Sequence, residues 1–296
     1  MDHRALISAL PSEDKARLID RSDQAGLKHL ALYAAAIVFC TAGIIGQVPF
    51  WPLLMVPQGI LLVFLFTLSH ECTHKTPFRT PWINETVGHV CAVLIALPFV
   101  WFRYFHLAHH KYTNDPDRDP ELEGRPRPNS WPGLMIYLSG WYFWRGMVRV
   151  LLTNAFGQID APYLPPRQHK AMRREARVIL ALYAAGIISL LFSSTLLWIW
   201  LIPLLIGQPF LRLYLLAEHG LCPPVANMLE NSRTTYTTRF IRFLAWNMPY
   251  HAEHHAYPNV PFHKLPAFHN WTRDHLKSTS DGYAEFTSDY TRSLAR

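Results

Sequence analysis

The chain has 296 residues, of which 50% are hydrophobic and 17% are charged, and its formal net charge is +7. Two long stretches, residues 30–69 and 178–211, contain no Asp, Glu, Lys or Arg. Each is longer than the ~20 apolar residues that a helix needs to cross a bilayer. This pattern excludes an ordinary soluble domain and predicts an integral membrane protein. Positive loops on the cytoplasmic side then explain the net charge more simply than nucleic-acid binding does.

The N-terminal part is predicted to contain a tail and one helical hairpin. Residues 1–29 are too charged for a secretory signal and are expected to form a cytosolic tail. Transmembrane helices are predicted at 30–48 and 53–74, because two prolines break the apolar run between them. Residues 86–102 are apolar but short, which favours a re-entrant or interfacial helix.

The second half repeats this outline. Residues 134–152 carry two arginines on an aromatic background and are read as another interfacial helix. Transmembrane helices are predicted at 174–192 and 196–219, and residues 278–296 form a polar C-terminal tail. Residues 103–173 and 220–277 are left to form a cap, so that residues 30–277 make one domain.

Two hairpins give four membrane crossings and place both termini and the cap on one face. All 28 Lys and Arg residues then lie on that face or at its edge. The positive-inside rule assigns this face to the cytoplasm. The predicted fold is therefore all-α, with four transmembrane helices and a cytosolic helical cap.

Sixteen histidines are present, and eight of them fall in three clusters. Three clusters have helical spacing, so that each shares one helix face. A ninth candidate follows the last predicted transmembrane helix. The nine are His70, His74, His106, His109, His110, His219, His251, His254 and His255. The remaining seven are read as isolated structural histidines: His3, His29, His89, His169, His263, His269 and His275.

Nine histidines are too many for one ion, and they suit two ions with four or five ligands each. Imidazole binds zinc, copper, iron and nickel, so the ligand type does not identify the metal. A di-metal site with open positions beside an apolar helix bundle suggests O2 activation on an apolar substrate.

The clusters HECTH, HLAHH and HAEHH resemble the three histidine boxes of the membrane fatty acid desaturase and hydroxylase superfamily. The flanking sequences HHKYTNDPDRDPE and HHAYPNVPFHKLP agree with this resemblance. It implies a mushroom-like fold with four membrane helices and a cytosolic cap that holds two iron ions, with zinc possible in purified material. It implies O2 as co-substrate and a fatty acyl chain or other lipid as substrate. His219 stands where family members often have an additional ligand, whereas Leu215 replaces an asparagine found in some of them.

Carboxylates near the boxes are candidates for orienting the imidazoles by accepting their free N–H groups. They are Asp115, Asp119, Glu218 and Glu253, and each is equally well read as a solvated charge. Glu71 lies about 100° from His70 around the helix, off the ligand face. It is read as a surface carboxylate or as another group that orients an imidazole.

Other functions explain fewer of these features. HECTH also satisfies the H-E-x-x-H pattern of zinc proteases, but a protease leaves seven clustered histidines unexplained. A metal transporter would place ionisable residues at mid-membrane, whereas these lie at helix exits. Within the superfamily, acyl desaturation leads, and hydroxylation or ketolation of a fatty acid or carotenoid is the alternative.

No electron-carrier module is recognisable in the sequence, which contains neither H-P-G-G nor paired C-x-x-C motifs. A separate ferredoxin or cytochrome-b-type protein is therefore expected as donor. Arg173, Arg174 and Arg177 are candidates for docking an acidic donor or for marking the membrane boundary.

Overall fold

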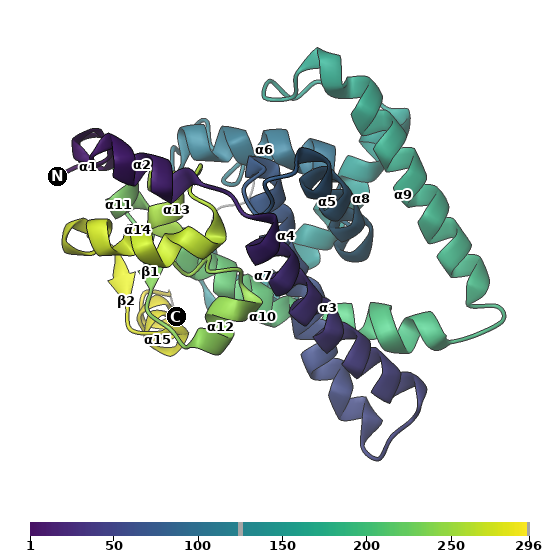
Figure 1. Ribbon diagram of the computed structural model, residues 1–296. Coiled ribbons are helices and arrows are strands. Elements are labelled where there is room, and N and C mark those ends of the chain that lie inside the picture. Colours follow the sequence, from purple (N-terminus) through teal and green to yellow (C-terminus); the bar gives the residue numbers. More distant parts are fainter. Residues whose placement is uncertain (124–126, 295–296) are drawn as a thin grey trace.

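A computed structural model describes residues 1–123 and 127–294, and most of them are helical (Figure 1). Residues 124–126 of the predicted cap and 295–296 of the predicted C-terminal tail lie outside this description. The α-helices are α1 (His3–Ala9), α2 (Ser12–Ile19), α3 (Asp23–Ile45), α4 (Met55–His74), α5 (Pro81–Ile95), α6 (Phe99–Tyr112), α7 (Trp131–Leu138), α8 (Trp141–Phe156), α9 (His169–Ser189), α10 (Ile202–His219), α11 (Met228–Asn231), α12 (Arg239–Leu244), α13 (His251–Ala256), α14 (Leu265–Thr272) and α15 (Tyr283–Arg292).

The predicted first hairpin is present as α3 and α4, joined by the single turn η1 (Trp51–Leu54). In Figure 1 its tip points away from the end where the cap elements gather. Helix α3 begins at Asp23, seven positions before the predicted start, because the Ser22 side chain accepts a hydrogen bond from the Ala25 N–H. This N-cap satisfies one of the free donors of the first turn.

Helices α4 and α10 pack closely at two glycines. A Cβ added to Gly59 would lie 2.1 Å from the Pro203 carbonyl oxygen, and one added to Gly207 would lie 2.3 Å from the Gly59 oxygen. Small residues allow membrane helices to approach at backbone distance. This contact fixes the relative position of the two helices whose last turns carry His70, His74 and His219.

The predicted helix 86–102 is divided into α5 and α6 by a break before Pro98, with a bend of 99°. Proline has no N–H and ends the ladder of α5, whose last residue is followed by Ala96 in the left-handed conformation. Glu175 of α9 then accepts hydrogen bonds from the Phe99 and Val100 N–H groups, both 2.9 Å long. A buried carboxylate from a distant helix thus caps the helix that carries the second histidine box.

The predicted helix 134–152 is likewise divided, into α7 and α8, at Ser139 and Gly140. Gly140 has φ of +73°, which glycine adopts without steric cost. The segment predicted at 174–192 is α9, which packs against α8 and α6. The segment predicted at 196–219 begins with a π-helical turn, η3 (Leu197–Leu201), and continues as α10.

Three helical segments in the described chain are long and apolar enough to cross a membrane: Ser12–Ile45, Trp51–His74 and Leu197–His219. The bent pair α5 and α6 would make a fourth if it formed one span. Helix α9 does not qualify, because Arg173, Arg174, Glu175 and Arg177 occupy its first half. The protein is therefore a largely helical membrane protein with three or four candidate spans.

Both terminal segments are folded onto the cap. The His3 backbone N–H donates to Asn227, which precedes α11, and the Met228 N–H donates to the His3 ring. At the other end, β2 (Thr279–Ser280) pairs in parallel with β1 (Thr234–Thr235) before α15 begins. Among the described residues, these two short strands depart from the predicted all-α class.

Candidate metal centre

Four helices bring the nine clustered histidines together. Helix α4 carries His70 and His74 in its last two turns, and α10 ends at His219. Helix α6 carries the HLAHH cluster, and the six-residue helix α13 carries HAEHH. The i, i+3, i+4 spacing places the histidines of each cluster on one face, as predicted.

The first group comprises five imidazoles: His70, His74, His106, His110 and His254. One ligand nitrogen of each lies within 4.8 Å of all the others. Nε2 of His74 is 2.8 Å from Nε2 of His106, and Nε2 of His110 is 3.2 Å from Nε2 of His254. His74 is the last residue of α4, and His106 lies on α6, which follows α5 in the chain. Because these two histidines meet, the pair α5 and α6 starts near the C-terminal end of α4 and returns to it.

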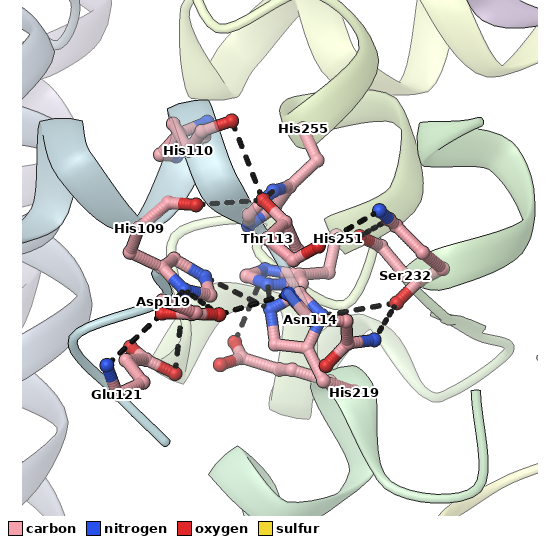
Figure 2. Close-up of polar contacts among 12 residues, drawn as sticks. His109, His110, Thr113, Asn114, Asp119, Glu121, His219, Ser232, His251 and His255 are labelled. Atoms are coloured by element: carbon pink, nitrogen blue, oxygen red, sulfur yellow. Dashed lines mark hydrogen bonds and ion pairs between the residues drawn. The ribbon is translucent and has the colours of Figure 1, made fainter. Parts of the chain in front are cut away.

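The second group comprises His109, His219 and His255, whose ligand nitrogens also lie within 4.8 Å of one another. His251 adjoins it, with Nε2 3.0 Å from Nε2 of His219. Nε2 of His219 is also 3.1 Å from Nε2 of His109. Figure 2 shows these side chains converging from α6, α10 and α13. The rings of His110 and His255 stack with centroids 4.0 Å apart, so the two groups are neighbours.

The geometry fits bound metal ions. Nitrogen ligands ~2.1 Å from one ion and at right angles to each other are ~3.0 Å apart, which matches the Nε2 separations in both groups. Both ring nitrogens of His70 and Nε2 of His255 are buried without a hydrogen-bond partner among the described residues. Buried polar atoms normally have partners, and an ion at each group would supply them.

The imidazoles of α13 are in the protonation state that metal binding requires. Burial lowers the pKa of His251, His254 and His255 well below the usual range of histidine, and neighbouring histidines add to the shift. The rings are therefore neutral at physiological pH. A neutral imidazole offers one nitrogen to a metal and donates a hydrogen bond from the other.

Two of the four predicted carboxylates contact clustered histidines. Both oxygens of Asp119 are 3.0 Å from Nδ1 of His109 (Figure 2). Glu218 lies 3.3 Å from Nδ1 of His251. Glu71 is fully buried, with Oε1 3.5 Å from Nδ1 of His254 and Oε2 accepting from the Phe262 N–H. It faces the third histidine cluster from a buried position and is therefore not a surface charge.

The other two predicted carboxylates have different partners in the described chain. Asp115 pairs with Arg118 at the surface of the loop after α6. Glu253 is buried on the far side of α13, where Thr234, His269 and Thr272 bond to it. All three residues are close to histidines in the sequence, so spacing did not show that Asp119 faces a clustered histidine whereas Asp115 and Glu253 do not. The direction of each carboxylate depends on the local backbone and on tertiary contacts.

Several contacts to the histidines were not predicted. Nδ1 of His255 lies 3.2 Å from the Thr113 hydroxyl, and Nδ1 of His219 lies 3.2 Å from the Asn231 carbonyl oxygen. Glu121 stands 3.7 Å from Nδ1 of His109. Thr113 follows His109 by one helical turn, so helical spacing could have predicted that it lies near the histidines. The contact with Asn231 could not have been predicted in this way, because its backbone carbonyl, and not its side chain, faces His219.

The seven histidines read as isolated lie outside both groups. His89, for example, lies 2.8 Å from Glu175, and His29 stacks on Phe243. His269, which was set aside, proves to be the partner of the buried Glu253.

Histidines clustered at the ends of apolar helices define a membrane protein with a site able to bind metal ions. Residues 24–287, which include all nine histidines, match the family model described as fatty acid desaturase. The chain belongs to the fatty acid desaturase family.

Several proteins named as desaturases match part of the chain, either over a short stretch or at low sequence identity. An sn-1 oleoyl-lipid 12-desaturase of Picosynechococcus sp. is 36% identical over 93 residues, which cover 31% of this chain and 26% of that protein. A protein of the same name from Arthrospira platensis is 23% identical over 234 residues, which cover 72% of this chain and 66% of that protein. An sn-1 acyl-lipid omega-3 desaturase (ferredoxin) of Nostoc sp. is 29% identical over 83 residues, covering 28% and 23%. The chain thus spans less than two thirds of each of these relatives.

Proposed function

We propose that this protein is a di-iron desaturase that introduces a double bond into the acyl chain of a lipid. The observation that carries the proposal is the convergence of nine histidines into two adjoining groups in a member of the fatty acid desaturase family. Hydroxylation or ketolation starts from the same kind of C–H bond, but the names of the relatives favour desaturation.

Each residue of the centre has a definite task in this proposal. His70, His74, His106, His110 and His254 hold one ion, and His109, His219, His251 and His255 hold the other. Two iron ions bound there supply the O2-dependent oxidation of an unactivated C–H bond. Asp119 accepts the outer N–H of His109 and keeps its Nε2 directed inwards, and Glu218 and Glu71 lie beside the outer nitrogens of His251 and His254.

We place the substrate chain beside the first group. Phe66 stands 6.3 Å from His70 and Phe102 stands 5.6 Å from His106 between ring centroids, and the two phenyl rings contact each other. Such a wall suits an acyl chain, because it removes apolar surface from water without competing for hydrogen bonds. It also keeps water from the reacting carbon.

Electrons are proposed to come from a separate protein. The relative from Nostoc sp. bears the word ferredoxin in its name, which supports a ferredoxin as donor, with a cytochrome-b-type protein as the alternative. Reconstitution of the purified protein with each reduced carrier distinguishes the two. The physiological donor class should support turnover, and absence of turnover with both carriers would contradict the proposed donor classes.

We place the histidine centre and both termini on the cytoplasmic face, with the two pairs 30–48/53–74 and 174–192/196–219 as the membrane crossings. In this topology the charged first half of α9 lies at the cytoplasmic edge of the third crossing. The support is the distribution of Lys and Arg, which the two apolar runs lack. Reporter fusions after residues 49, 193 and 294 test this topology. The first two should report the outside and the third the cytoplasm.

The decisive experiment is lipid mass spectrometry of cells with and without expression. Desaturation appears as acyl chains that have lost a pair of hydrogens, whereas hydroxylation adds one oxygen atom. His106→Ala and His254→Ala should abolish the product, and His275→Ala, outside both groups, should retain it. Purified protein should contain about two metal ions per chain. A single zinc ion with peptidase activity would overturn the proposal.

A further inference from the structure

Two adjoining surface grooves run along the first half of α9. One, of about 390 Å³, is lined on its polar side by Glu85, His89, Arg103, Arg174 and Glu175. The other, of about 530 Å³, is lined by Lys170, Arg173, Arg174, Arg177, Val178 and Ala181. Arg174 and Val178 line both grooves, so they form one continuous feature, here called the α9 groove.

The α9 groove carries uncompensated positive charge. Glu85 is bound by Arg103 in two 2.9 Å hydrogen bonds, and Glu175 is occupied by His89 and by the N-terminus of α6. Within the described residues, no ion pair involves Lys170, Arg173, Arg174 or Arg177. These four cations are therefore available to an anion from outside the chain.

Two of the cations are held in place by the end of α8. Nε of Arg177 donates to the Ala155 carbonyl oxygen at 3.0 Å, and Arg173 donates to the Gly157 oxygen at 3.4 Å. Lys170 and Arg174 remain exposed beside them. Partial immobilisation lowers the entropy that a bound anion must remove from the side chains.

An apolar surface continues directly from the cationic one. Beyond Arg177, the large exposed side chains of α9 are Val178, Leu182, Ile187 and Ile188, with exposed fractions of 52%, 49%, 68% and 57%. In Figure 1 this part of α9 runs along the margin of the molecule. The helix therefore presents cations at one end and a lipid-compatible face at the other.

We propose that the α9 groove binds an anionic glycerophospholipid of the surrounding leaflet. Its phosphate lies among Lys170, Arg173, Arg174 and Arg177, and its acyl chains follow Val178 and Leu182. This lipid is distinct from the substrate, because none of the nine clustered histidines lines either groove. An acidic protein fits less well, since the cations directly adjoin the apolar part of α9, which faces lipid in the topology proposed above.

The test uses the full-length, metal-loaded protein in nanodiscs of phosphatidylcholine with a minor fraction of phosphatidylglycerol. Lipids retained by the protein are quantified by native mass spectrometry. Lys170→Gln/Arg174→Gln removes two exposed cations of the groove. Arg4→Gln/Arg273→Gln, which removes two exposed cations elsewhere, is the matched control. Lys170→Arg/Arg174→Lys keeps the charge and checks that the groove tolerates substitution.

Wild type should be enriched in phosphatidylglycerol, and the Lys170→Gln/Arg174→Gln variant should bind it roughly 25-fold more weakly, at about fivefold per cation. The control and the charge-conserving variant should retain the enrichment. High salt should weaken it, and millimolar inorganic phosphate should not replace the lipid.

Three results would overturn the proposal. One is the absence of any phosphatidylglycerol enrichment in wild type. Another is an equal loss in the Arg4→Gln/Arg273→Gln control, which would mean that only net charge matters. The third is unchanged lipid binding together with lost binding of an acidic electron carrier, which would assign the groove to a protein. Activity is not the readout, so the result is independent of the reaction proposed above.

Discussion

The two histidine groups differ in how their outer nitrogens are held. In the second group, Nδ1 of His109, His219 and His255 is hydrogen-bonded to an oxygen at 3.0 to 3.2 Å, and Nδ1 of His251 lies 3.3 Å from Glu218 without a hydrogen bond. In the first group, as far as the described residues show, Nδ1 of His254 lies 3.5 Å from Glu71 without a hydrogen bond, and His70 has no partner. The second group therefore has more hydrogen bonds to its outer nitrogens than the first.

This difference matches the surroundings of the groups. The second is enclosed by Asp119, Asn114 and Thr113 in a polar network (Figure 2), and Asn231 donates to the Thr113 carbonyl oxygen. The first is bordered by Phe66 and Phe102, which accept no hydrogen bonds. Because outer-sphere partners raise metal affinity, we expect the second group to retain its ion more tightly. We expect the first to be the more adaptable, which suits a site beside the substrate.

The largest expected effect comes from removing one ligand from each group. His70→Ala and His255→Ala should each lower product formation by more than about a hundredfold, beyond the range for loss of an outer partner. Metal analysis should show that each variant keeps close to one ion, because the other group is intact. Loss of both ions from either variant would contradict the division into two groups, and His275→Ala provides the control.

Asp119→Asn tests the support of the second group. The Asp119 carboxylate accepts from the Asn114 and Glu121 N–H groups as well as facing His109. An amide NH2 in its place therefore faces a donor in either orientation. We expect metal affinity of this group to fall by about 10- to 100-fold. Metal retained after a chelator challenge measures this, and Asp117→Asn in the same loop is the control. Equal metal loss from both groups would argue against a local effect.

Glu71→Gln tests the weaker support of the first group. The glutamine oxygen still accepts the Phe262 N–H, which places its NH2 towards Nδ1 of His254. An NH2 group there favours the tautomer of His254 that carries its hydrogen on Nε2, and a protonated Nε2 cannot bind a metal. We expect about a tenfold loss of metal affinity, at the low end of the range because the wild-type contact is long. Faster metal release from the second group than from the first would contradict this assignment.

The sequence alone predicted the parts of this centre that follow from helical spacing. The clusters at 70–74, 106–110 and 251–255 need only short helices, and the chain forms them. Spacing did not predict which carboxylates face the histidines: Asp119 does, whereas Asp115, four residues earlier, turns to Arg118. The breaks at Pro98 and Gly140 have local causes in those residues, whereas the folding of both termini onto the cap depends on tertiary contacts that a linear pattern does not contain.

Glu175→Ala tests a contact that serves both groups at once. The Glu175 carboxylate caps α6 through the Phe99 and Val100 N–H groups, and α6 carries His106 and His110 to the first group and His109 to the second. Its loss leaves two buried donors without their acceptor and removes the partner of His89. We expect the free energy of unfolding to fall by about 2 kcal/mol.

Thermal unfolding of the purified protein measures the effect of Glu175→Ala, and Glu13→Ala, which removes an exposed ion pair with Arg17, should change stability by less than about 1 kcal/mol. Because α6 is shared, Glu175→Ala should weaken metal retention in both groups to a similar degree, unlike Asp119→Asn or Glu71→Gln. Selective loss from one group would mean that α9 supports that group alone. A shared loss would show that the difference between the groups arises from their outer oxygens and not from the helix on which both depend.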